Sequence, residues 1–75
     1  MLYVYSKENC AQCRTAMAML KSKGVEFEVL KLEAGDFTRE DLKMLAPEAK
    51  SFPQVFDNSK LIGGVPELQQ YLKNI

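Results

Sequence analysis

The two cysteines of this chain, Cys10 and Cys13, are the residues whose type and spacing best suit chemistry. A Cys-x-x-Cys pair is typical of sites that pass between a dithiol and a disulfide. The chain contains no histidine, which removes the Ser-His and Cys-His nucleophilic pairs and the most common metal ligand. Two cysteines are also too few for a closed zinc site built from sulfur. Thiol redox chemistry is therefore the leading hypothesis.

The helix that holds this pair should make its two thiols unequal. We expect a helix over residues 11–23 with Asn9 as its cap, which places Cys10 at the helix start and Cys13 one turn further in. Backbone N–H groups without helical partners and the positive end of the helix dipole stabilise a thiolate at Cys10. Cys13 lies on the inward face of the helix, so it should be more buried and placed to attack a mixed disulfide at Cys10.

Three other interpretations of the pair stay open at this point. Free cysteines are often small core side chains. Two cysteines could also form half of a metal or iron–sulfur site that a second chain completes. A structural disulfide is less favoured, because the closed loop is short and the chain is expected in a reducing compartment.

The composition indicates an ordinary folded domain and excludes several classes of partner. Hydrophobic residues make up 47% of the 75 residues and charged residues 27%, as in typical globular chains. Ten Lys and Arg balance ten Asp and Glu, so the chain lacks the basic surplus of nucleic-acid-binding proteins. No apolar run approaches the roughly 20 residues that span a bilayer, and residues 1–10 lack the apolar segment of a signal peptide. We therefore expect one domain over residues 1–75, a cytoplasmic monomer with no nucleic-acid or membrane partner.

The hydrophobic pattern predicts an α/β fold with the order β-α-β-α-β-β-α. Helical spacing or alternation of apolar side chains, interrupted by Gly and Pro, divides the chain into these elements. Strands are expected at residues 2–5, 25–32, 52–56 and 60–62, and helices at 11–23, 38–46 and after Gly64. A right-handed crossover makes the first two strands parallel neighbours, and turn residues make the last two an antiparallel hairpin. The result is a four-stranded mixed sheet with three helices.

Local signals mark the ends of these elements and the sides of the helices. Gly24 suits a left-handed end of the first helix, and Thr38 with Asp41 three residues later has the spacing of a capping box. Met44 is expected as a core side chain and residues 39–43 as a polar helix face.

Three segments of the chain together resemble the glutaredoxins, the small glutathione-linked members of the thioredoxin fold. The first is Lys7-Glu8-Asn9-Cys10-x-x-Cys13-Arg14, the second is Phe52-Pro53-Gln54-Val55-Phe56, and the third is Leu61-Ile62-Gly63-Gly64 before a helix. Their order and spacing carry the resemblance over essentially the whole chain. It implies a thioredoxin-like fold and a dithiol-disulfide oxidoreductase that reduces protein disulfides or glutathione mixed disulfides.

The resemblance also implies roles for single residues. Cys10 would be the nucleophile and Cys13 the resolving thiol, and Lys7 would pair with a glutathione carboxylate. Pro53 is similar to the family's cis-proline beside the active cysteines. Phe52 would then offer its N–H and C=O to the cysteinyl part of glutathione, like an added strand.

Three further residues complete the glutathione contacts that the resemblance implies, namely Gln12, Gly64 and Glu67. Glutaredoxins usually carry an acidic residue where Pro66 stands, so Glu67 would replace its contact with the α-amino group of glutathione. Glutathione would be a co-substrate, and we expect no bound cofactor and no metal.

The residues between the cysteines indicate an alternative electron donor to glutathione. Typical dithiol glutaredoxins carry Pro-Tyr there, whereas this chain carries Ala11-Gln12. That pair and Thr15 are similar to the glutaredoxin-like redoxins that serve ribonucleotide reductase and take electrons from thioredoxin reductase. Ribonucleotide reductase is therefore an expected client. The other alternative is a carrier without catalytic activity that holds an iron–sulfur cluster between two chains.

Overall fold

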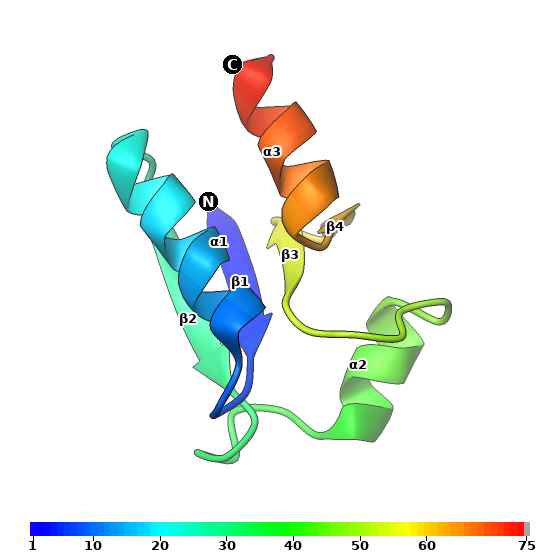
Figure 1. Cartoon of the computed structure of the whole chain (residues 1–75). Coiled ribbons are helices and arrows are strands. Elements are labelled where there is room, and N and C mark those ends of the chain that lie inside the picture. Colours follow the sequence, from blue (N-terminus) through cyan, green and yellow to red (C-terminus); the bar gives the residue numbers. More distant parts are fainter. Residues whose placement is uncertain (75) are drawn as a thin grey trace.

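The elements along the chain follow the expected order β-α-β-α-β-β-α in a computed structural model that describes residues 1–74. Ile75, the last residue of the expected domain, lies outside the described residues. The four strands form one mixed sheet in the order β2-β1-β3-β4 (Figure 1). The elements are β1 (Leu2–Ser6), α1 (Ala11–Ser22), β2 (Phe27–Lys31), α2 (Arg39–Leu45), β3 (Gln54–Asp57), β4 (Lys60–Gly63) and α3 (Val65–Lys73).

The strand pairing confirms the two predicted pairs, β1 with β2 and β3 with β4, and adds the pairing of β1 with β3. β1 runs parallel to β2, with Val4 opposite Val29, and antiparallel to β3, with Val4 also opposite Val55. β3 and β4 form the antiparallel hairpin. The two central strands, β1 and β3, therefore carry on their ends the two loops in which the sequence analysis placed the chemistry.

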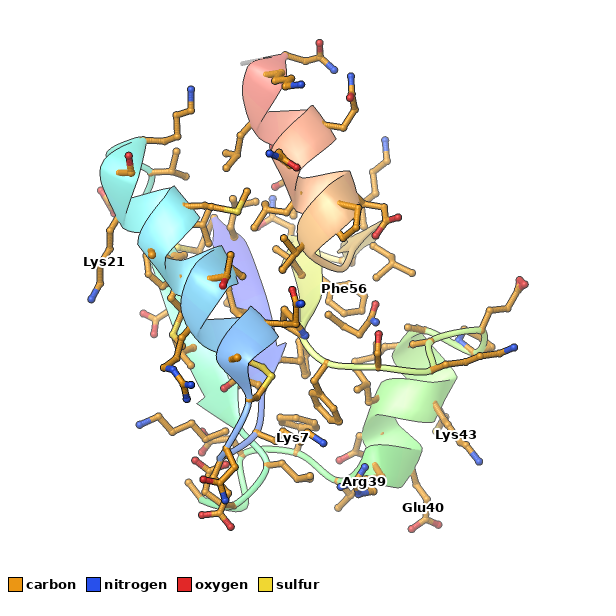
Figure 2. All side chains as sticks on the ribbon, in the orientation of Figure 1. Lys7, Lys21, Arg39, Glu40, Lys43 and Phe56 are labelled. Atoms are coloured by element: carbon orange, nitrogen blue, oxygen red, sulfur yellow. A yellow bond between two sulfur atoms is a disulfide. The ribbon has the colours of Figure 1, made fainter. Side chains whose placement is uncertain are left out.

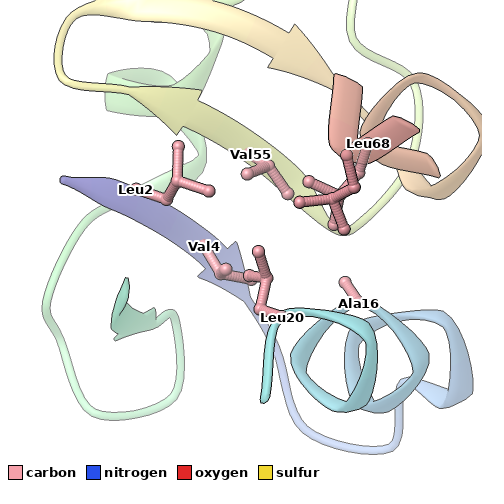
Figure 3. Packing of buried hydrophobic residues seen from close by; sticks show 7 residues of the cluster. Leu2, Val4, Ala16, Leu20, Val55 and Leu68 are labelled. Carbon is pink, nitrogen blue, oxygen red and sulfur yellow. The ribbon is translucent and has the colours of Figure 1, made fainter. Parts of the chain in front are cut away.

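Alternation along β1 gives the sheet two apolar faces, because successive side chains of a strand point to opposite sides. Leu2 and Val4 face α1 and α3, whereas Tyr3 and Tyr5 face α2. Figure 2 shows the side chains that fill the space between the helices and the sheet. The core under α1 and α3 is built from Leu2, Val4, Ala16, Leu20, Val55, Leu68 and Leu72 (Figure 3), and the core under α2 from Phe37, Leu42, Ala46 and Phe56.

Two strands begin two residues later than predicted, each for an identifiable reason, and the strand ends differ by one residue. β2 begins at Phe27 instead of residue 25, because the Val25 N–H donates to the Leu20 carbonyl at the end of the preceding helix (3.1 Å). β3 begins at Gln54 instead of residue 52, because Pro53 has no N–H for the sheet ladder.

The expected helix ends are confirmed, but one expected core side chain is not. Gly24 adopts a φ of +68°, and Thr38 and Asp41 form the full capping box, with N–H···O distances of 2.9 and 3.0 Å. The prediction for Met44 was wrong, since this side chain is 82% exposed. Met44 is two residues away from both Leu42 and Ala46, which face inward. It therefore lies on the opposite side of α2 and faces the solvent. No helix within residues 1–74 is long and apolar enough to cross a membrane.

A hydrogen bond joins α3 to the end of β3. The Tyr71 hydroxyl donates to the Asp57 carboxylate at 2.9 Å. This bond raises the pKa of Tyr71 above its ordinary value of 10.0, and burial and the negative charge of Asp57 act in the same direction. A phenol whose pKa is raised on folding stabilises the fold fully below its unfolded pKa and loses that contribution as the pH rises through the folded pKa.

Replacing Tyr71 by Phe should therefore destabilise the protein in a pH-dependent way. We expect the Y71F variant to lose about 0.5–1 kcal/mol of unfolding free energy at neutral pH, because one partly exposed hydrogen bond is lost. The difference from the parent should shrink as the pH rises above about 10. Urea unfolding of both proteins at several pH values measures it. A difference that stays constant up to pH 11 would contradict the assignment.

Candidate active site

Cys10 itself caps the start of α1. It is the N-cap residue, with φ −124° and ψ 101°, and its Sγ accepts a hydrogen bond from the Cys13 N–H at 3.1 Å. The prediction that Asn9 caps the helix was wrong. Asn9 precedes the cap in a left-handed conformation with a φ of +55°, which asparagine tolerates better than most residues. The sulfur that could do chemistry therefore also occupies the acceptor position at the start of the helix.

A disulfide joins Cys10 to Cys13, with the two Cα atoms 5.3 Å apart. Cys13 is the more buried of the two, as expected, with 1% of its surface exposed against 7% for Cys10. An approaching thiolate therefore has better access to the Cys10 sulfur. A backbone donor stands beside that sulfur, and the same donor is in place to stabilise negative charge there after reduction.

The Phe52–Pro53 peptide bond is cis, as the resemblance implies. Pro53 is buried and Phe52 is half-buried. The buried Gln54 side chain bridges this segment, because its Nε2 donates a hydrogen bond to the Ser51 carbonyl at 2.8 Å. The turn between β4 and α3 lies next to it, because a side-chain carbon added at Gly64 would lie 3.6 Å from the Pro53 carbonyl oxygen.

Contacts between aromatic rings connect Tyr5 in the sheet to Phe52. Tyr5 of β1 makes edge contacts with Phe37 and Phe56, with ring centroids 4.9 and 5.1 Å apart. Phe37 in turn lies 6.2 Å from Phe52. The core under α2 therefore positions the residue that precedes the cis-proline.

Five of the six expected glutathione contacts line one pocket of about 620 Å³, namely Gln12, Phe52, Pro53, Gly64 and Glu67. The sixth, Lys7, lines a neighbouring pocket of about 420 Å³. Phe52 borders both pockets, and the Lys7 ammonium lies 5.4 Å from its ring centroid. Within residues 1–74, no three or more His, Cys, Asp or Glu side chains are grouped so that they could hold a metal ion.

Sequence reasoning missed that Arg39 belongs to this region. Its guanidinium carbon lies 5.7 Å from the Phe52 ring centroid, on the border of the pocket that Lys7 lines. The signal was present in the spacing, because Arg39 and Lys43 are four residues apart and so share a helix face with Leu42. The polar face expected at residues 39–43 is thus in part the wall of a pocket.

Glu67 has a structural task that sequence reasoning also missed. Its Oε1 accepts a hydrogen bond from the Gly64 N–H at 2.9 Å. This is one half of a capping box at the start of α3, since Gly64 has no side chain to supply the other half. Pro66, in the first turn of the helix, contributes no N–H. The spacing of Gly64 and Glu67 is the usual spacing of a capping box. One carboxylate oxygen of Glu67 is therefore already engaged within the protein.

The two glycines before α3 have different constraints. Gly63 has a φ of +127°, and a Cβ there would lie 2.7 Å from the Glu67 Cγ. Gly64 has a φ of −89°, and a Cβ there would meet nothing closer than 3.6 Å. The backbone therefore requires glycine at position 63 and tolerates a side chain at position 64.

Comparison with known proteins places these features in one family. The glutaredoxin family model matches residues 2–62. Glutaredoxin 3 of Escherichia coli strain K12 is 35% identical over 65 residues, which cover 87% of this chain and 77% of that protein. The reduced E. coli glutaredoxin structure has a TM-score of 0.81 at 20% identity and covers 97% of this chain and 93% of its own. The buckwheat glutaredoxin–glutathione complex has the same TM-score at 24% identity, covering 97% of this chain and 68% of that one.

Alanine at the two glycines should separate their roles. We expect Gly63→Ala to lower the unfolding free energy by about 2 kcal/mol or more, because it combines an unfavourable φ with a contact that forces Glu67 to move. Gly64→Ala is the matched control and should cost less than about 1 kcal/mol. Urea denaturation of both variants measures the difference, and equal losses would refute this distinction.

Proposed function

This chain belongs to the glutaredoxin family, and we propose on that basis that it reduces protein disulfides and glutathione mixed disulfides in the cytoplasm. In this proposal residues 1–75 act as one monomeric glutaredoxin-like domain. A dithiol that is recycled by reduction needs a reducing compartment, which supports the cytoplasm as its location.

The observation that carries this proposal is the asymmetric disulfide at the start of α1. Cys10 is the more exposed of the two cysteines, and the Cys13 N–H lies beside its sulfur. In the reduced protein the Cys10 thiolate attacks a substrate disulfide, forms a mixed disulfide and releases one substrate thiol. Cys13 then loses its proton and attacks the Cys10 sulfur, which releases the second substrate thiol. Two electrons and two protons pass to the substrate, and the Cys10–Cys13 disulfide remains.

Glutathione resets the disulfide in this proposal. One glutathione thiolate attacks the Cys10 sulfur and displaces the Cys13 thiolate, which takes up a proton. A second glutathione attacks the mixed disulfide, leaves as glutathione disulfide and returns the Cys10 thiolate. The Cys13 N–H then faces the negative sulfur, so the leaving group is stabilised by a donor that is already in place.

The two pockets on either side of Phe52 support glutathione as the co-substrate. Lys7 would pair with a carboxylate of the tripeptide, and the backbone of Phe52 would hold its cysteinyl part. The other four expected contacts line the larger pocket: Gln12, Pro53, Gly64 and Glu67. The likeness to a glutaredoxin that was solved as a glutathione complex points in the same direction.

One feature, the start of α3, instead supports thioredoxin reductase as an alternative electron donor. The Gly64 N–H is occupied by Glu67, and Pro66 has no N–H to offer. This helix start therefore has fewer donors for a carboxylate of glutathione. The same observation fits a redoxin that serves ribonucleotide reductase, the client that the residues Ala11 and Gln12 suggest.

Oxidation of NADPH in two reconstituted systems decides between the donors. One system contains glutathione and glutathione reductase, and the other contains thioredoxin reductase alone, each with insulin as the disulfide substrate. We expect turnover in the first system. Turnover in the second system only would overturn glutathione dependence and leave the oxidoreductase assignment intact. No turnover in either system would count against the proposed activity itself.

Serine at the two cysteines should separate their roles. Cys10→Ser is expected to abolish turnover with every substrate, because no other thiolate stands at the attacking position. Cys13→Ser should still exchange glutathione on a glutathionylated peptide but should no longer reduce an internal peptide disulfide, which needs the second thiol. Release of the peptide thiols, followed by mass spectrometry, reports both activities. Full activity of the Cys10→Ser variant would show that the nucleophile is assigned wrongly.

A further inference from the structure

Four basic side chains surround the smaller pocket beside the active site: Lys7, Arg39, Lys43 and Lys50. The pocket measures about 420 Å³, and no carboxylate is among the residues that line it, all of which lie within the described part of the chain. The whole chain carries ten basic and ten acidic residues. The lining of this pocket is therefore basic on a chain with no net charge, although Lys7 and Arg39 also line a neighbouring pocket together with Glu8 and Glu33.

The arrangement of α2 produces part of this basic lining. Arg39 and Lys43 stand four residues apart on the face of the helix that also carries the buried Leu42. The acidic residues of the same helix are directed elsewhere, since Asp41 is engaged in the capping box with Thr38. Figure 2 shows Arg39 on the side of α2 toward Lys7, with Glu40 pointing away.

The ring of Phe52 holds two of these cations close together. The Lys7 ammonium and the Arg39 guanidinium lie 5.4 and 5.7 Å from its centroid, although one comes from the loop after β1 and the other from α2. Like charges gathered around one pocket repel each other, and an anionic partner relieves that repulsion. Phe52 also lines the larger pocket together with Gln12, which lies between the two cysteines, so such a partner would lie near the Cys10–Cys13 disulfide.

We propose that this pocket binds an acidic segment of a client polypeptide, next to the disulfide that Cys10 attacks. The inference rests on the proposed function and names its substrate class. A single carboxylate is satisfied by one cation, whereas four cations around one pocket match several carboxylates. An acidic peptide segment supplies these along one extended chain. Its aliphatic parts would pack on the half-buried Ala49 and Phe52, behind which the buried Leu42 and Ala46 complete the apolar part of the lining.

Single-turnover reduction of designed peptides tests this substrate class without any electron donor. The protein is reduced with dithiothreitol, desalted and mixed with fluorescent peptides that hold one internal disulfide flanked by Glu, Gln or Lys. Each reaction passes two electrons from the protein dithiol to the peptide disulfide, and the two released thiols take up one proton from Cys13 and one from the solvent. We expect the Glu peptide to react about tenfold faster than the Gln peptide at low salt, and the Lys peptide more slowly than either. At about 0.5 M salt most of the preference should disappear.

A charge-matched pair of variants assigns the preference to the pocket. In the double variant Arg39→Gln/Lys43→Gln the ratio of the Glu to the Gln peptide rate should fall toward one. In Lys60→Gln/Lys73→Gln, which removes the same charge from two exposed side chains outside the pocket lining, the ratio should persist.

Two results would overturn the inference while the proposed function stands. One is equal reduction of the three peptides. The other is a ratio that falls equally in both double variants, which would assign the preference to net charge. Failure to reduce any peptide would instead refute the proposed function, and the inference with it.

Discussion

The hydrogen bond from the Cys13 N–H to the Cys10 sulfur is the interaction on which the candidate site depends. A side-chain oxygen commonly accepts from the free N–H groups of a helix start, and here the acceptor is the redox sulfur instead. This hydrogen bond therefore constrains three neighbouring segments at once, namely the end of β1, the left-handed Asn9 and the first turn of α1. The hydrogen bond that caps the helix is therefore also the one that places a donor beside the reactive sulfur.

The second constraint is that the sheet is covered on both faces. α1 and α3 cover one face, and the start of α1 carries the disulfide, whereas α2 covers the other face and carries Arg39. The aromatic contacts from Tyr5 through Phe37 to Phe52 connect the second core to the cis-proline segment. The site therefore lies where both layers reach the same end of the sheet, and its parts come from segments far apart in the sequence.

Local patterns were sufficient to predict the element order, the β1–β2 and β3–β4 pairs and the cysteine pair, because each depends on periodicity or on segments that follow one another in the chain. The antiparallel pairing of β1 with β3 was not predicted, because it joins segments far apart in the chain. The failures have specific causes. Asn9 was predicted as the cap because common capping preferences are for oxygen acceptors, and Cys10 took that role. Met44 was predicted as buried from its residue type, although its helix face decides its exposure. The contact of Arg39 with Phe52 depends on tertiary packing, which no local pattern contains.

Phe52 forms a wall of both pockets, and this has a consequence for how the protein can change over evolutionary time. A substitution at this position would alter both pockets at once, so it is exposed to two selective pressures together. Arg39 borders only the smaller of the two and Glu67 only the larger. Substitutions at these outer residues would therefore change one pocket at a time, whereas the shared segment 49–52, with Phe52 at its end, constrains both.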